Sequence, residues 1–199
     1  MVMIRPIVPE DREELRREFQ HISARTRYLR FLGVVGDLSE DMLTYLTCVD
    51  QQTHIALVAV TTSPDLKTER GVGVARLIRL KGHPEIAEAA ITVVDDLQKR
   101  GIGTALALEL EHAARARGIR HIRADVLEGN AAMRGILDGA GAERVDVGES
   151  GGTISYDVAL DAAHHPISSK LVDILRGAAQ TMAVSIRKLV PPDRPPHDG

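Results

Sequence analysis

The sequence predicts one α/β domain built on a mixed β-sheet, followed by a short C-terminal segment. Three observations support this prediction. Apolar runs of strand length alternate with amphipathic helical patterns, two of these runs flank a polar turn as in a β-hairpin, and a glycine-containing turn joins another run to a helix. The chain has 199 residues, of which 44% are hydrophobic and 27% charged, which is enough to bury the core of one domain.

Strand and helix patterns follow one another along residues 2–160. Apolar runs predict strands at 2–7, 53–61, 71–80, 84–94, 120–127, 143–147 and 153–160. Apolar positions at helical spacing predict helices at about 9–20, 39–47, 104–117 and 131–140. Ser39 is placed to cap the second helix and Gly118 to end the third, while residues 22–37 are basic and apolar without a regular pattern.

Composition excludes several classes of function. The net charge is -3 and aromatic residues make up 3%, so we expect neither the basic surface nor the stacking platform of a nucleic-acid-binding protein. No apolar run approaches the ~20 residues of a membrane span. The single cysteine, Cys48, lies in an apolar stretch and predicts a buried, inert thiol, and the eight histidines lack metal-ligand spacing. We therefore expect a cytoplasmic protein with no metal, no membrane contact and no nucleic acid.

The character of the chain changes after Asp161, which divides it into a domain at 1–161 and an appendage at 162–199. Residues 167–189 carry apolar side chains at helical spacing, and residues 190–199 are rich in proline. The predicted helix would pack on its own domain or on a second copy, forming a homodimer. It has only four cations, which does not favour a membrane-surface helix.

The most informative segment is the turn at 98–104, with the sequence Gln-Lys-Arg-Gly-Ile-Gly-Thr. It lies between a predicted strand and a predicted helix. The first N–H groups of a helix have no partner within it and lie at its positive end, so this turn can bind an anion such as a pyrophosphate. It matches neither the P-loop nor the dinucleotide-binding pattern. From the pattern alone, a glycine turn with a purely structural role stays open.

This Gln-x-x-Gly-x-Gly turn after the fourth strand, together with Asn130 just after the fifth, resembles the GNAT superfamily of acyl-CoA-dependent N-acetyltransferases. The resemblance covers about residues 3–160 and implies the GNAT fold, a mixed and mostly antiparallel central sheet flanked by helices. It implies acetyl-CoA as co-substrate, with the fourth strand pairing with its pantetheine arm and the turn holding its pyrophosphate. The implied cofactor-binding residues are Thr92, Val93, Gln98, Lys99, Arg100, Gly101, Ile102, Gly103, Thr104 and Asn130; Asn130 also fits a helix cap.

A narrower resemblance involves the segments IRPIVPED, SARTRYLRFLG, VDQQTHIALVAV, AEAAITVVDDLQKRGIGT and DVLEGNAAM, which are similar to bacterial Pat-type protein lysine acetyltransferases. It implies transfer to lysine ε-amines of proteins, an acyl-CoA synthetase among them, with Glu88 as general base. A lysine amine has a pKa of about 10.4, so neutralising it near pH 7.4 costs ~4 kcal/mol and a base is needed. Asp125 is the rival base. A solvated strand-end Glu88 and an outward-facing Asp125 are the structural alternatives.

The sequence departs from the family at Leu137, where many members have a tyrosine that protonates the departing thiolate. Tyr156, a water molecule, or no specific acid are the alternatives. A basic cluster with aromatic side chains in residues 25–31 is the candidate for the acceptor side, or else a surface loop. Two other functions stay open. A deep, closed acceptor pocket would favour a small-molecule amine acetyltransferase of the same fold, and the departure at Leu137 leaves room for a non-catalytic acyl-CoA-binding sensor.

Overall fold

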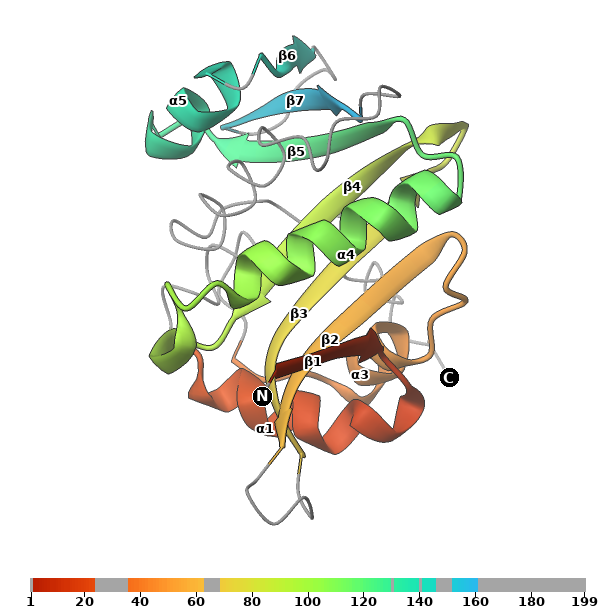
Figure 1. Ribbon diagram of the computed structural model, residues 1–199, viewed down its shortest axis with the longest axis vertical. Helices are drawn as coiled ribbons and strands as arrows, with labels where there is room; N and C mark the ends of the chain where they lie inside the picture. The colour runs from red at the N-terminus through yellow and green to blue at the C-terminus, as the bar shows by residue number, and fades with distance from the viewer. Residues whose placement is uncertain are drawn as a thin grey trace, which may run out of the picture.

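A computed structural model describes residues 2–23, 36–62, 69–129, 131–139, 141–145 and 152–160. Seven strands form one sheet in the order β1-β2-β3-β4-β5-β7-β6 (Figure 1). The strands are β1 (Val2–Pro6), β2 (His54–Thr62), β3 (Glu69–Leu80), β4 (His83–Val93), β5 (His121–Leu127), β6 (Glu143–Val145) and β7 (Thr153–Ala159). The helices are α1 (Arg12–His21), α3 (Glu40–Thr47), α4 (Ile102–Ala116) and α5 (Ala131–Gly139), with 3-10 turns η1 (Pro9–Asp11) and η2 (Asp95–Leu97).

The sheet is mixed and mostly antiparallel, as predicted. Among its strand pairs, only β4 and β5 run parallel. Their pairing is confined to Ile86–Glu88 of β4 and His121–Arg123 of β5, whereas β4 stays paired with β3 as far as Val93. The two strands therefore diverge beyond Glu88, and Figure 1 shows β4 and β5 running in diverging directions.

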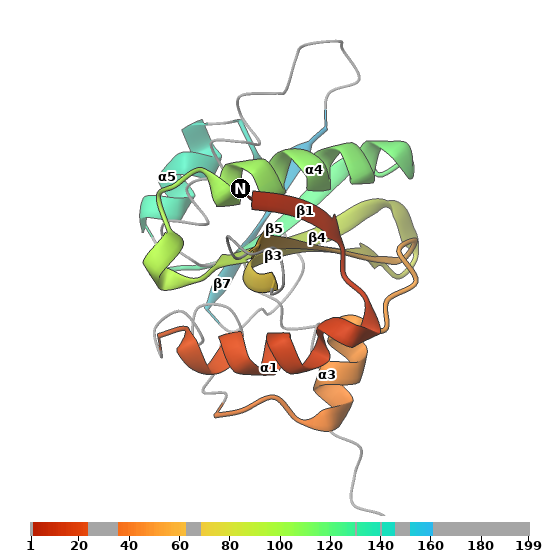
Figure 2. The ribbon, with the colours of Figure 1, turned by 60° about the horizontal axis from the view of Figure 1, so that its bottom comes forward.

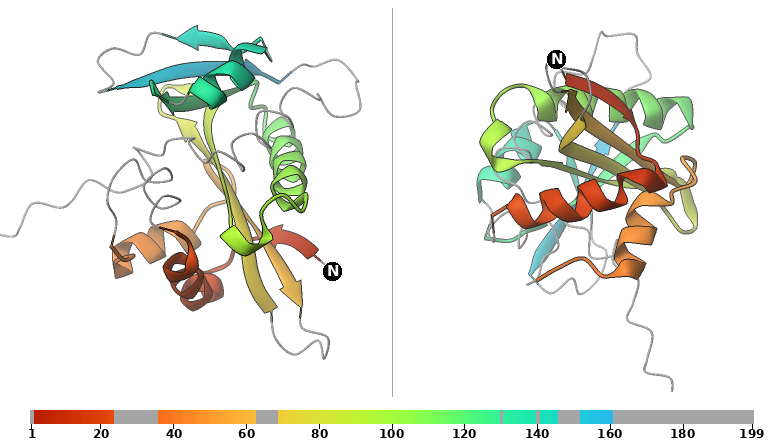
Figure 3. Two further views of the ribbon diagram at one scale, coloured as in Figure 1. Left: turned by 90° about the vertical axis from the view of Figure 1, so that its left-hand side faces the viewer. Right: turned by 90° about the horizontal axis from the view of Figure 1, so that it is seen from below.

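Helices cover both faces of the sheet. Figures 2 and 3 show α1 and α3 on one face and α4 on the other. Successive residues of a strand face opposite sides, so Glu88, Ala90 and Thr92 share one face of β4. Ala90 packs against Tyr45 of α3, which identifies this face as the one covered by α1 and α3. The alternate residues of β4 join the main apolar core beneath α4.

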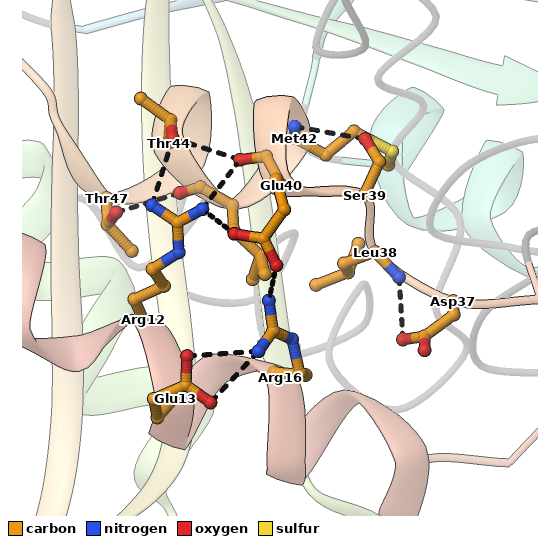
Figure 4. Close-up of polar contacts among 11 residues, drawn as sticks. Arg12, Glu13, Arg16, Asp37, Leu38, Ser39, Glu40, Met42, Thr44 and Thr47 are labelled. Carbon is orange, nitrogen blue, oxygen red and sulfur yellow. Dashed lines mark hydrogen bonds and ion pairs between the residues drawn. The ribbon is translucent and has the colours of Figure 1, made fainter.

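A polar network joins α1 to α3 (Figure 4). The guanidinium of Arg12 donates to the Thr44 hydroxyl at 3.1 Å and to the Glu40 carbonyl at 3.2 Å. Arg12 and Arg16 both form ion pairs with the Glu40 carboxylate. The two helices are therefore held together as one cover over this face of the sheet.

The predicted helix ends agree with the structure. The Ser39 hydroxyl accepts a hydrogen bond from the Met42 N–H at 3.3 Å, and Gly118 follows the last residues of α4 with a left-handed φ of 73°.

The prediction of a buried thiol at Cys48 is wrong, because this residue is exposed. Cys48 is the C-terminal cap of α3, whose buried side is made by Leu43, Leu46 and Thr47. The predicted helix at 167–189 lies outside the described residues.

Among the helices that the structure describes, none is long and apolar enough to cross a membrane.

The turn before β2 depends on one carboxylate. Asp50 accepts hydrogen bonds from the N–H groups of Gln52, Thr53 and His54 at 2.8–2.9 Å and from the Thr53 hydroxyl at 2.5 Å. Partial desolvation raises the pKa of Asp50, but these hydrogen bonds outweigh it and hold the pKa below its usual value.

We expect Asp50→Ala to lower the free energy of unfolding at pH 7 by about 1–2 kcal/mol, since it leaves these donors without their acceptor. Because the folded pKa is lowered, the stabilisation is present above the unfolded pKa and is lost as pH falls below it. Urea unfolding at pH 7 and at pH 3.5 measures both effects. Asp50→Asn keeps one acceptor oxygen and should lose less. An Asp50→Ala protein as stable as the wild type would contradict this role.

Candidate active site

Glu88 lies at the point where β4 and β5 separate. It pairs with Ile78 of β3 on one side and with Arg123 of β5 on the other, and it is the last residue of β4 that pairs with β5. Its side chain is 7% exposed, so the carboxylate is buried within the sheet face rather than solvated at a strand end. The next residue of β4 on the same face, Ala90, has a small side chain.

Three side chains that the sequence analysis did not anticipate lie on the same face as Glu88. The Tyr45 and His54 rings have centroids 5.2 Å apart, and Arg76 Nη1 lies 3.3 Å from His54 Nε2. Arg76 pairs with Ala90 of β4, which is two residues after Glu88 and therefore on the same face. A signal for Arg76 exists in the sequence, because it is a charged residue inside the apolar run GVGVARLI.

Electrostatics connect these groups to Glu88. Burial raises the pKa of Tyr45, the charge of Arg76 opposes this shift, and the charge of Glu88 adds to it. Burial lowers the pKa of Arg76 to about 10, so its guanidinium still carries a charge at neutral pH. Tyr45 is therefore a neutral phenol near both a buried cation and a buried carboxylate.

On the β5 side, Arg123 is already paired. Its Nε and Nη2 donate to the two oxygens of Asp157, each at 2.7 Å. The hydrogen bonds from Arg123 to Asp157 raise the pKa of Arg123, burial opposes them, and the charges of Asp157, Asp125 and Glu88 add to the increase. Glu88 thus faces a guanidinium whose main partner is another carboxylate.

Asp125 is also on this face, two residues beyond Arg123, and is half-buried rather than outward-facing. It accepts a hydrogen bond from the buried Ser155 hydroxyl at 2.5 Å. Tyr156 pairs with Ala124, so its completely buried side chain lies on the opposite face of the sheet from Glu88. Leu137 is likewise buried in the core.

The glycine turn leads from β4 through η2 into α4, as predicted. Gln98 braces it, since its Nε2 donates to the Val93 carbonyl at 3.2 Å and to Asp95 Oδ1 at 2.9 Å. Lys99 and Gly101 take left-handed φ values of 61° and 85°. The Ala105 N–H bonds to the Gly101 carbonyl at 2.9 Å, so the N–H groups of the residues before it lie at the open, positive end of α4.

The arrangement fits a long ligand with an anionic group. The open end of α4 suits the anion, with the exposed side chains of Lys99 and Arg100 beside it, and Ile102, Gly103 and Thr104 form the first turn. Beyond Glu88, β4 has no strand pairing on its β5 side within the described residues. Along this part of β4, which includes Thr92 and Val93, the Val93 carbonyl already accepts from Gln98 Nε2. Asn130 and the cluster at 25–31 lie outside the described residues.

Residues 9–138 match the Acetyltransferase (GNAT) family. The chain belongs to this family. GNAT enzymes use acetyl-CoA as the acetyl donor, and this chain is accordingly an acetyl-CoA-dependent N-acetyltransferase.

Relatives support the same family. An acetyltransferase of Pseudomonas aeruginosa is 34% identical over 133 residues, which are 67% of this chain and 70% of the relative. Acetyltransferase Pat of Mycolicibacterium smegmatis is 34% identical over 182 residues, covering 89% of this chain but only 51% of Pat. The GNAT domain of S. lividans PAT superposes with a TM-score of 0.68 and 28% identity, over 80% of this chain and 90% of that domain. The chain therefore resembles the catalytic domain of Pat-type enzymes.

Proposed function

We propose that this GNAT acetyltransferase transfers the acetyl group to lysine ε-amines of proteins, with Glu88 as the general base. The observation that carries the proposal is the buried carboxylate of Glu88 at the point where β4 separates from β5. The similarity to Pat supports the substrate class, although the chain spans about half of that protein's length. An acyl-CoA synthetase is one protein acceptor that this similarity suggests.

Bound acetyl-CoA supplies the acetyl group as an activated thioester. The chain's own residues do three things. Backbone N–H groups at the open end of α4 bind the pyrophosphate. The edge of β4 at Thr92 and Val93, which pairs with no described strand on its β5 side, orients the extended arm. Glu88 accepts a proton from the incoming ammonium, which leaves the nitrogen lone pair free to attack. Asp125 is a weaker candidate for this role because its Oδ1 already accepts from Ser155.

A small-molecule amine is the second candidate acceptor. A pocket lies between α1 and the sheet, on the Glu88 face. An enclosed pocket suits a small molecule, whereas a protein lysine requires an open groove. The third candidate is a non-catalytic acyl-CoA sensor, which would bind acetyl-CoA equally well after Glu88→Gln and show no turnover.

The experiment that tests the function uses labelled acetyl-CoA and a desalted soluble protein extract of the source organism. We expect label to appear in acid-precipitable protein as Nε-acetyl-lysine, identified by mass spectrometry, and to fall to background with Glu88→Gln. Label confined to small molecules in an extract that has not been desalted would favour the second acceptor. No label in either fraction, with intact acetyl-CoA binding, would contradict enzymatic transfer.

Three further properties of the chain accompany this proposal. A cytoplasmic location fits the single cysteine, and a division at residue 161 fits the change in composition there. A homodimer through residues 162–199 rests on their helical apolar spacing alone.

A further inference from the structure

Arg76 is a buried cation that the proposed reaction does not use. It lies in the middle of β3 and is 2% exposed. Its hydrogen-bond contact is with His54, a neutral acceptor when it receives a guanidinium N–H. No carboxylate forms an ion pair with it within the part of the chain that the structure describes. A guanidinium has five donors, and burying its charge without an anionic partner is costly.

Arg76 lines the pocket between α1 and the sheet. Most of the wall around it is apolar, with side chains from α1, α3, β2 and β3 that include Leu15, Phe19, Leu46, Val58, Val60 and Val74. Thr92 lines the same pocket, and its buried hydroxyl has no hydrogen-bond partner among the residues that the structure describes. Thr92 pairs with Val74 of β3, and Val74 lies two residues before Arg76 on the same face of the sheet. The other arginine of the pocket, Arg5, pairs with Asp11 and Glu69, so among the described residues the pocket offers one cation without a carboxylate partner and one unused hydroxyl.

The acids of this pocket are already partnered. Asp11 accepts from both terminal nitrogens of Arg5, and Glu69 pairs with the same arginine at 3.2 Å. Glu18 pairs with Arg70 at 3.2 Å. The fourth acid, Glu14, accepts from the Gly71 N–H at 2.9 Å and pairs with Arg17. None of them forms an ion pair with Arg76, so the positive charge remains at the inner wall.

We propose that this pocket binds a small carboxylate with an apolar body, in which the Arg76 guanidinium holds the carboxylate and the Thr92 hydroxyl donates to a polar atom of the ligand. A planar carboxylate matches the guanidinium fork and carries a single charge. A phosphate dianion carries twice that charge, so the acids of the pocket would repel it more strongly than a carboxylate. The apolar walls suit an alkyl or aryl body. This is the pocket considered above for a small-molecule amine, and a buried guanidinium without a carboxylate partner favours a carboxylate there over an ammonium. The inference does not depend on acetyl transfer or on a protein lysine as acceptor.

The test is a calorimetric titration of the full chain, without acetyl-CoA, using hexanoate and benzoate against their neutral amides. We expect both carboxylates to bind the wild type at least about tenfold more tightly than the amides, and we expect Arg76→Met to remove that preference. Arg79→Met is the matched control on the same strand. Arg79 bonds to the carbonyls of Pro84 and Arg117 and does not line the pocket, so its variant should bind like the wild type.

Thermal unfolding separates a ligand site from a structural role. If Arg76 serves a ligand, the unliganded Arg76→Met protein should be at least as stable as the wild type, because a buried charge without a carboxylate has been removed. Arg76→Lys keeps the charge but loses the fork, so it should bind hexanoate more weakly than the wild type and still prefer it to the amide. The proposal is overturned if the wild type shows no preference for carboxylates, or if Arg76→Met folds and retains the preference.

Discussion

Glu88→Gln is expected to lower kcat at pH 7.5 by roughly 10²- to 10⁴-fold, the usual contribution of a positioned general base. The amide keeps the size and most of the polarity of the side chain, but it cannot accept a proton from the amine. Binding of acetyl-CoA should change by less than about twofold, since the residues proposed to hold it lie on the glycine turn and on β4 beyond Glu88. Steady-state release of free CoA thiol, with calorimetry for acetyl-CoA, measures the two quantities.

Asp125→Asn is the matched control, since both carboxylates lie on the same face and receive the same chemical change. We expect its kcat to fall by less than about tenfold, because Asp125 already accepts from Ser155. A large loss with Asp125→Asn and a small one with Glu88→Gln would move the base to β5. A large loss of acetyl-CoA binding with Glu88→Gln would show that this side chain binds the donor instead.

Gly73→Val is expected to lower the free energy of unfolding by about 3 kcal/mol. A Cβ atom at Gly73 would lie 2.9 Å from Leu106 Cδ1 and 3.0 Å from the Thr92 carbonyl oxygen. The Leu106 methyl group can move a little, but the carbonyl belongs to the backbone of β4. Gly73 is therefore required for the close approach of β3, β4 and α4, and urea unfolding monitored by circular dichroism measures the loss.

Gly135→Ala provides the contrast for this prediction. Gly135 lies inside α5, and a Cβ atom there meets nothing within 4 Å. Alanine should stabilise the helix by about 0.5–1 kcal/mol, since glycine is the poorer helix former. Equal effects of the two substitutions would show that contacts around Gly73 do not limit its replacement.

Much of the fold was predictable because local patterns determine it. Strand alternation, the Ser39 cap and the Gly118 end each depend on residues close together in the sequence. The burial of Cys48 was mispredicted, because apolar neighbours in the sequence do not show whether a side chain at a helix end points into the core or into solvent.

The site was predictable only along β4. The glycine turn and Glu88 belong to one continuous segment, and their pattern carries the family resemblance. The cluster of Tyr45, His54 and Arg76 forms only when α3 packs over β4 and three strands take their register. Such contacts between distant segments depend on tertiary packing, which the local pattern does not contain.

The most direct measurement of Glu88 as base is the pH dependence of acetyl transfer to a lysine peptide, from pH 7 to pH 10, for the wild type and Glu88→Gln. Without the base, the reaction depends on amine that is already neutral, so the variant's rate should rise by about tenfold per pH unit toward the amine pKa of about 10.4. The gap to the wild type should therefore narrow as pH rises. A gap that stays constant across this range, or a variant as fast as the wild type at pH 7, would contradict proton transfer to Glu88.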